Sequence, residues 1–84
     1  MYKVVLGKDA ARTLEKLPVK MQRRIISALG RLSANPLKGK RLRGGLEGLF
    51  SLRIGEMRVV YEIDSARQAI VVHGIGSRGD IYKK

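Results

Sequence analysis

The sequence predicts an α+β fold of order βααβββ, in which a two-helix hairpin packs on one face of a mainly antiparallel four-stranded sheet. Three observations support this prediction. Apolar residues recur at helical spacing between residues 10 and 32, runs rich in β-branched and aromatic residues flank that region, and Gly, Pro, Asn or Asp stands at the boundaries. A length of 84 residues suits one small domain, so we expect a single domain over residues 1–84.

The first half of the chain predicts one strand and two helices. Residues 2–6 (YKVVL) have the composition of a short strand. Asp9 is expected to cap a first helix, which Pro18 ends. Pro18 also suits the first turn of a second helix, which ends at Asn35 before a further proline. The apolar stripe of this second helix comprises Met21, Ile25, Ala28, Leu29 and Leu32.

The second half predicts a loop followed by three strands. Residues 38–48 (KGKRLRGGLEG) have the composition of a glycine-rich basic loop. Strands are expected over 49–54 and 57–63, with Gly55 at the first position of a two-residue type II′ turn between them. Residues 69–75 are apolar at nearly every position, which is typical of an interior strand covered on both sides.

The two-residue turn sets the register of the hairpin. It places Arg53 directly opposite Arg58, and strand alternation then separates two faces. The face expected to join the core carries Phe50, Leu52, Ile54, Met57, Val59 and Tyr61. The other face, expected to be partly open and basic, carries Ser51, Arg53, Arg58, Val60 and Glu62. Two like charges placed opposite each other are unfavourable by roughly 0.2–1 kcal/mol, which a bound anion would relieve unless the side chains splay into water.

Charge is the most informative bulk property of the chain. Eighteen Lys and Arg residues against seven Asp and Glu residues give a net charge of +11. Such a field attracts polyanions, whereas solubility alone needs a net charge of only ~2–8. No segment approaches the ~20 apolar residues of a membrane span, and the N-terminus does not resemble a signal peptide. With no cysteines, the chain is expected to be cytoplasmic, without a membrane partner or disulfides.

The ionisable residues point to chemistry without a metal or another cofactor. The carboxylates show no metal-ligand spacing, and His73, inside an apolar strand, is interpreted as structural. RNA supplies its own nucleophile, the 2′-hydroxyl, so positioned arginines need only orient the nucleotide and neutralise the developing charge. Arg78 and Tyr82 follow the interior strand and can reach the face of Arg53 and Arg58. Tyr82 could stack on a base or join proton transfer, although a packing role is the alternative.

The chain carries, in order, Leu42-Arg43-Gly44 and the segments 48–55 (GLFSLRIG), 57–62 (MRVVYE) and 76–82 (GSRGDIY). Together with the order βααβββ, this set resembles the RelE toxins of bacterial and archaeal toxin–antitoxin systems over essentially the whole chain. The resemblance implies a ribosome-dependent endoribonuclease that cuts messenger RNA in the ribosomal A site and stops translation. It also implies a RelB-like antitoxin as partner and a toxin–antitoxin complex that binds its own operator DNA.

The resemblance assigns catalytic roles to individual residues. Arg58 and Arg78 match arginines that stabilise the phosphate during cleavage, and Tyr82 matches a tyrosine that orients the target nucleotide. Ser51 and Arg53 stand where the best-known member has two lysines. Arg53 keeps the charge but is a poor general base, because its pKa lies above ~12. The resemblance therefore leaves the general base unassigned.

The basic loop supplies the expected RNA-binding residues. Arg43 matches a family position that contacts the RNA backbone, Lys40 and Arg41 lie beside it, and Ser51 of the following strand is also expected to bind RNA. Two other functions stay open at this point. ParE-like toxins share the fold and act by binding DNA gyrase, although such chains generally lack the combination of Arg58, Arg78 and Tyr82. The remaining alternative is a basic nucleic-acid-binding module without catalysis.

Overall fold

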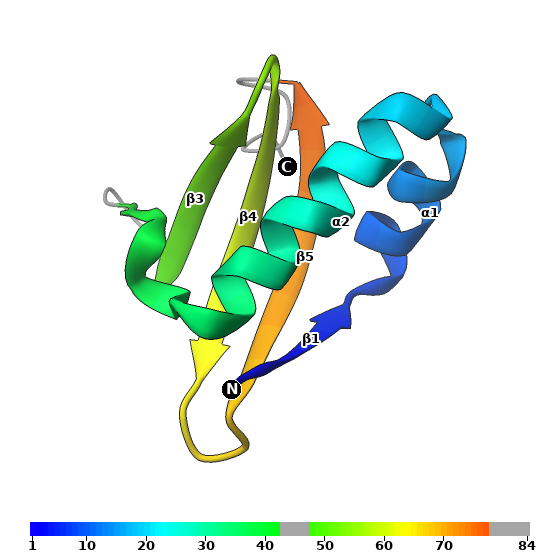
Figure 1. Cartoon of the computed structure of the whole chain (residues 1–84). Coiled ribbons are helices and arrows are strands. Elements are labelled where there is room, and N and C mark those ends of the chain that lie inside the picture. Colours follow the sequence, from blue (N-terminus) through cyan, green and yellow to red (C-terminus); the bar gives the residue numbers. More distant parts are fainter. Residues whose placement is uncertain (43–47, 78–84) are drawn as a thin grey trace.

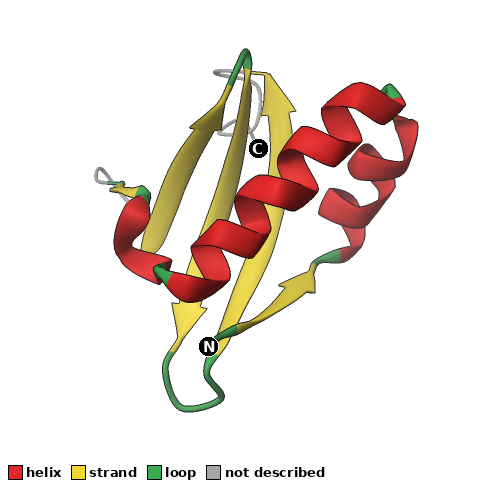
Figure 2. Ribbon diagram, in the orientation of Figure 1, coloured by secondary structure: helices red, strands yellow, loops and turns green. Residues whose placement is uncertain are grey.

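The computed structural model describes residues 1–42 and 48–77. In this part of the chain, two helices pack on one face of a five-stranded sheet (Figures 1 and 2). The strands lie in the order β1-β5-β4-β3-β2, and β1 is parallel to β5 while the other pairs are antiparallel. Their bounds are β1 (Lys3–Leu6), β2 (Lys40–Arg41), β3 (Leu49–Ile54), β4 (Met57–Asp64) and β5 (Ala69–Ser77). The predicted α+β class is confirmed.

The sheet has one strand more than the four predicted. The additional strand, β2, is two residues long and lies in the segment that its glycine content marked as a loop. A short 3-10 helix, η1 (Pro36–Lys38), precedes it. Both elements depend on contacts with β3 and β4 that are distant in sequence, so local composition could not reveal them.

The helical hairpin consists of α1 (Lys8–Lys16) and α2 (Val19–Ala34), and Figure 1 shows α2 lying diagonally across the sheet. The expected cap at Asp9 was wrong, because the helix begins at Lys8 and the N-cap position, two residues before Asp9, is occupied by Gly7. The N–H of Gly7 donates to the carbonyl of Val72 at 2.8 Å, so the chain remains paired with β5 up to the start of the helix. Asp9 lies in the first turn, where its charge favours the helix dipole. Asn35 ends α2 as predicted, whereas Pro18, expected in the first turn, occupies the N-cap position just before the helix begins at Val19.

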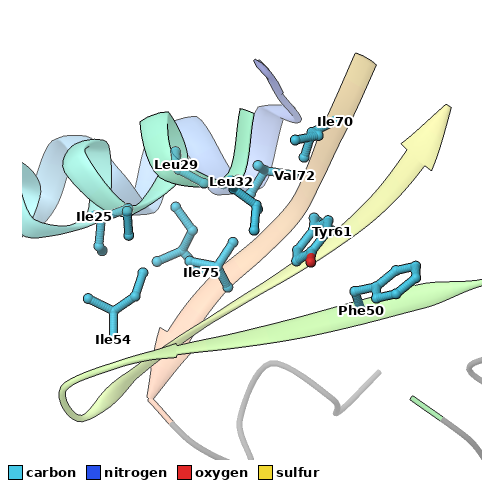
Figure 3. Packing of buried hydrophobic residues seen from close by; sticks show 12 residues of the cluster. Ile25, Leu29, Leu32, Phe50, Ile54, Tyr61, Ile70, Val72 and Ile75 are labelled. Atoms are coloured by element: carbon cyan, nitrogen blue, oxygen red, sulfur yellow. The ribbon is translucent and has the colours of Figure 1, made fainter. Parts of the chain in front are cut away.

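The core lies between the helices and the sheet (Figure 3). The predicted stripe of α2 is confirmed: Met21 packs against the core while partly buried, and the other four residues are buried. The predicted core face of the hairpin is also confirmed, with Leu52 and Met57 partly buried and the rest buried. Strand β5 contributes the buried residues Ile70, Val72 and Ile75. It lies between β1 and β4, as expected of an interior strand.

The hairpin turn has the predicted geometry. Gly55 has a φ of 62°, and Glu56 is not among the residues with positive φ, which is the pattern of a type II′ turn. The register is the expected one, with Arg53 opposite Arg58.

A β-bulge interrupts the pairing of β4 with β5 and was not predicted. The register passes from Tyr61–Val72 to Val60–Gly74, which leaves His73 without a residue opposite. Because side chains alternate along a strand, this extra residue keeps both Val72 and Ile75 in the core although they are three positions apart. His73 Nε2 lies 2.8 Å from Glu62 Oε1, so this exposed imidazole is paired with a carboxylate.

Candidate active site

Two arginines stand side by side on the sheet face that points away from the helices. Arg53 of β3 and Arg58 of β4 are direct cross-strand partners one step from the hairpin turn, so both side chains project to this face. Arg53 is exposed and Arg58 is partly buried. On the other side of Arg58, β5 presents Gly76, which adds no side chain to the face. We call this pair of arginines and its surroundings the arginine face.

The electrostatics of the arginine face favour an anion. Arg53 Nε donates a hydrogen bond to the carbonyl oxygen of Gly55 at 3.3 Å, which directs its side chain toward the turn. Arg58 cannot accept a hydrogen bond from Arg53, because guanidinium groups only donate. An oxyanion lying between the two guanidinium groups would receive charge-assisted hydrogen bonds from both.

The short strand β2 divides the expected RNA-binding residues between the two faces of the sheet. Lys40 is opposite Ser51 and therefore belongs to the arginine face. Arg41 is opposite Phe50 on the helix side, where its guanidinium carbon lies 5.7 Å from the Phe50 ring centroid. Ser51 shares the arginine face but is only 5% exposed, so its side chain is not at the surface. The structure thus brings Lys40 toward Arg53 and Arg58 and separates Arg41 from them.

A buried tyrosine positions this basic segment. The Tyr61 hydroxyl donates to the Pro36 carbonyl at 2.7 Å and accepts from the Gly39 N–H at 3.0 Å. Its ring stacks on Phe50 with centroids 5.4 Å apart. Burial raises the pKa of Tyr61, and the hydrogen bond from Gly39 offsets part of that rise. A β-carbon at position 39 would lie 2.9 Å from Tyr61 Cε1, so this close approach requires glycine.

Three of the predicted site residues, Arg43, Arg78 and Tyr82, lie outside the residues that the structure describes. The described part of β5 ends at Ser77, which is paired with Met57, the neighbour of Arg58. Figure 1 shows this end of β5 beside the β3–β4 turn. The convergence of Arg78 and Tyr82 on the arginine face stays a prediction.

No metal site is built from the described residues, because they contain no group of three or more His, Cys, Asp or Glu side chains that could hold an ion. In the same part of the chain, neither helix is long and apolar enough to cross a membrane.

A second basic surface lies between α2 and β3 and was missed by sequence reasoning. It is a cleft of about 580 Å³. Its cationic lining residues are Arg23, Arg24, Arg31, Lys38 and Arg53. We call it the basic cleft. The sequence signal that could have revealed it is the one-turn spacing of residues 23, 27 and 31 along the flank of the apolar stripe of α2.

Comparisons with known proteins agree over almost the whole chain. The model of the family described as "ParE toxin of type II toxin-antitoxin system, parDE" matches residues 4–82. Toxin RelG of Mycobacterium tuberculosis is 39% identical over 85 residues, which cover 99% of this chain and 98% of that protein. Toxin RelE of the same organism is 39% identical over 84 residues, with 98% and 87% covered. The crystal structure of the toxin–antitoxin complex RelBE2 from Mycobacterium tuberculosis contains a chain that superimposes with a TM-score of 0.84 at 38% identity, over 92% of this chain and 98% of that one.

Proposed function

Because the chain belongs to the ParE toxin family of type II toxin–antitoxin systems, within the RelE/ParE superfamily, we propose that it is a ribosome-dependent endoribonuclease that cleaves messenger RNA in the ribosomal A site. Among relatives, the similarity to toxins named RelG and RelE supports an RNA target. The observation that carries the proposal is the arginine face, where the exposed Arg53 and the partly buried Arg58 stand opposite each other on neighbouring strands.

The proposed reaction uses the 2′-hydroxyl of the substrate as nucleophile. The 2′-oxygen forms a bond to the adjacent phosphorus while the bond from phosphorus to the 5′-oxygen breaks, which leaves a 2′,3′-cyclic phosphate. Arg58 neutralises the charge that develops on the phosphate oxygens, and Arg53 holds the phosphate from the neighbouring strand. The 2′-hydroxyl proton goes to a base that is neither arginine, because a guanidinium stays protonated. The leaving 5′-oxygen takes up a proton.

The family resemblance adds Arg78 as a second phosphate-stabilising group and Tyr82 as the residue that orients the nucleotide. These roles require both side chains to reach the arginine face from beyond Ser77. Ser77 is paired with Met57, the residue next to Arg58, so the proposed approach starts close to that face. Arg43 and Lys40 are assigned to the RNA backbone. No metal or other cofactor takes part in the proposed reaction.

The proposed partner is an acidic antitoxin of the RelB type, and the proposed setting is the cytoplasm. The superimposed relative was crystallised in a toxin–antitoxin complex, which supports this assignment. A net charge of +11 complements an acidic chain. We expect the antitoxin to cover the arginine face and the complex to bind its own operator DNA.

Inducible expression in a bacterial host, followed by mapping of the 5′ ends of translated messages, tests the proposal. We expect ends at a fixed codon position that disappear in Arg58→Ala and Arg78→Ala. The matched control Arg12→Ala removes an exposed arginine of α1 that lies on neither basic surface, and it should cut as the wild type does. A 2′-methoxy group at the cut nucleotide should abolish cleavage, and continued cutting would refute the mechanism.

One observation favours a second candidate function. The matching family model carries the name of ParE, and a ParE-like toxin would act by binding DNA gyrase. The same expression experiment separates the two functions. Growth arrest with intact messages and broken DNA would identify a gyrase poison, and the absence of toxicity would indicate a nucleic-acid-binding module without catalysis.

A further inference from the structure

The basic cleft gathers cations from three elements of the fold. Three arginines come from α2, Lys38 comes from η1 and Arg53 comes from β3. At its base lie Ala28 and Ile54, which are only 4% and 8% exposed. The charged groups that the described residues of the cleft offer an incoming ligand are therefore all guanidinium and ammonium groups.

Carboxylates do not neutralise the basic cleft within residues 1–42 and 48–77. The ion pairs found there join Arg67 to Asp64 and His73 to Glu62, and none of these residues lines the cleft. Every described ionisable residue in the lining is a cation. Like charges held together in this way repel one another, so an anion placed among them gains from several charges at once.

Local contacts hold some of these guanidinium groups at the cleft. Arg31 Nη1 donates to the Ser27 hydroxyl, one helical turn earlier, at 3.3 Å. Arg24 lies against the hairpin turn, where a β-carbon on Gly55 would stand 3.3 Å from its nearest guanidinium nitrogen. Because these side chains have already lost part of their freedom, a ligand needs to order less of the cleft on binding.

The basic cleft meets the arginine face at the edge of the sheet. Strand β2 pairs only with Phe50 and Ser51, so within the described chain the rest of β3 has no strand on its outer side. Arg53 lies on this edge, opposite Arg58 and also in the lining of the cleft. An extended polyanion on the arginine face can therefore continue over the edge of β3 into the cleft without leaving positive surface.

We propose that the basic cleft binds the phosphate backbone of RNA as a site additional to the arginine face. The inference rests on the proposed function only for the identity of the nucleic acid. Guanidinium groups match phosphate oxygens in bidentate geometry, and interfaces with nucleic acid are more polar and more positive than those with protein. Peptides dock mainly through buried apolar anchors, whereas the distinguishing feature of this cleft is its five cations among the described residues, so phosphate is the better matched ligand.

The test compares two double variants that lose equal charge. The cleft variant is Arg23→Gln with Arg31→Gln on α2, and the control is Arg12→Gln with Lys16→Gln on α1. Each pair contains one exposed cation from the last turn of its helix, so the two variants match in helix-dipole effects as well as charge. The probe is a short single-stranded RNA with 2′-methoxy groups, whose binding is measured by fluorescence anisotropy over a range of salt concentrations.

The readout is the slope of log Kd against log salt concentration. Each lost phosphate contact lowers the slope by about 0.7 for single strands, so the cleft variant should lower it by roughly 1.4 while the control leaves it nearly unchanged. Equal slopes for both variants would overturn the proposal, because net charge alone would then explain binding. The proposal would also be overturned if the cleft variant bound RNA normally but no longer bound the antitoxin, because the cleft would then be a protein-binding site.

Two further arms locate the source of the phosphates and isolate the proposal. If the cleft variant binds both vacant ribosomes and the free RNA strand more weakly, the site is assigned to ribosomal RNA. If its affinity falls for the free strand alone, the site is assigned to messenger RNA. Neither arm requires cleavage. A wild-type chain that binds RNA through the cleft but never cuts a message would therefore refute the proposed function and leave this inference standing.

Discussion

Removing the hydroxyl of Tyr61 should measure how firmly the basic segment is held to the core. Tyr61→Phe keeps the ring that stacks on Phe50 and deletes the bonds to Pro36 and Gly39. Two hydrogen bonds of about 0.5–1.5 kcal/mol each amount to about 1–3 kcal/mol. A small domain has a total stability of only about 5–15 kcal/mol, so the loss is a considerable fraction.

Guanidinium denaturation followed by circular dichroism provides the assay. The midpoint should fall at an unchanged m-value, because the substitution does not alter the surface exposed on unfolding. Tyr2→Phe is the matched control. Tyr2 is partly buried and packs against the core, but its hydroxyl makes no hydrogen bond among those found in the described chain. If Tyr61→Phe shifted the midpoint no further than Tyr2→Phe, water would be replacing the hydroxyl and the anchoring explanation would be incorrect.

Three further outcomes are expected. Burial raises the pKa of Tyr61 above 10.0 in the folded state, so the protonated hydroxyl contributes fully to stability below pH 10. This contribution is lost as pH rises through the folded-state pKa, and Tyr61→Phe should not show this loss when its unfolding is followed at alkaline pH. Arg53→Gln removes a like-charge pair and should raise the free energy of unfolding by about 0.2–1 kcal/mol at low salt. The control Arg12→Gln should leave the free energy of unfolding unchanged. An equal effect of the two substitutions would contradict repulsion between Arg53 and Arg58. A β-carbon at Gly30 of α2 would meet open space, so Gly30→Ala should stabilise the fold by about 0.5–1 kcal/mol and raise the thermal midpoint. Gly39→Ala should lower the midpoint, because its β-carbon would collide with Tyr61. A higher midpoint for Gly39→Ala would show that Tyr61 can move away.

Much of the fold was predictable because its signals are short in range. The α2 stripe recurs every three or four residues, and Gly55 supplies the positive φ that a type II′ turn needs. A two-residue turn leaves one register for the hairpin, so the pairing of Arg53 with Arg58 was predictable from a local feature. The arginine face is thus the part of the candidate site that sequence patterns can identify.

The remaining features depend on residues that meet only in the folded chain. A bulge at His73 is invisible in a continuous apolar run, because it appears only when β5 pairs with β4. The two residues of β2 become a strand by pairing with β3, and this pairing sends Lys40 and Arg41 to opposite faces. Their place also depends on the Tyr61 hydroxyl, more than twenty positions away in sequence.

The sequence by itself determined the order of the two helices and the four longer strands, the inward residues of the hairpin and the excess of positive charge, because each follows from periodicity, a turn or a sum over residues. Tertiary structure alone decided that a second group of cations gathers in the basic cleft. Arg31 and Lys38 border the same cleft as Arg53 only because α2 packs across the sheet beside the edge of β3. Packing between distant elements sets such distances, and no pattern along the chain encodes them.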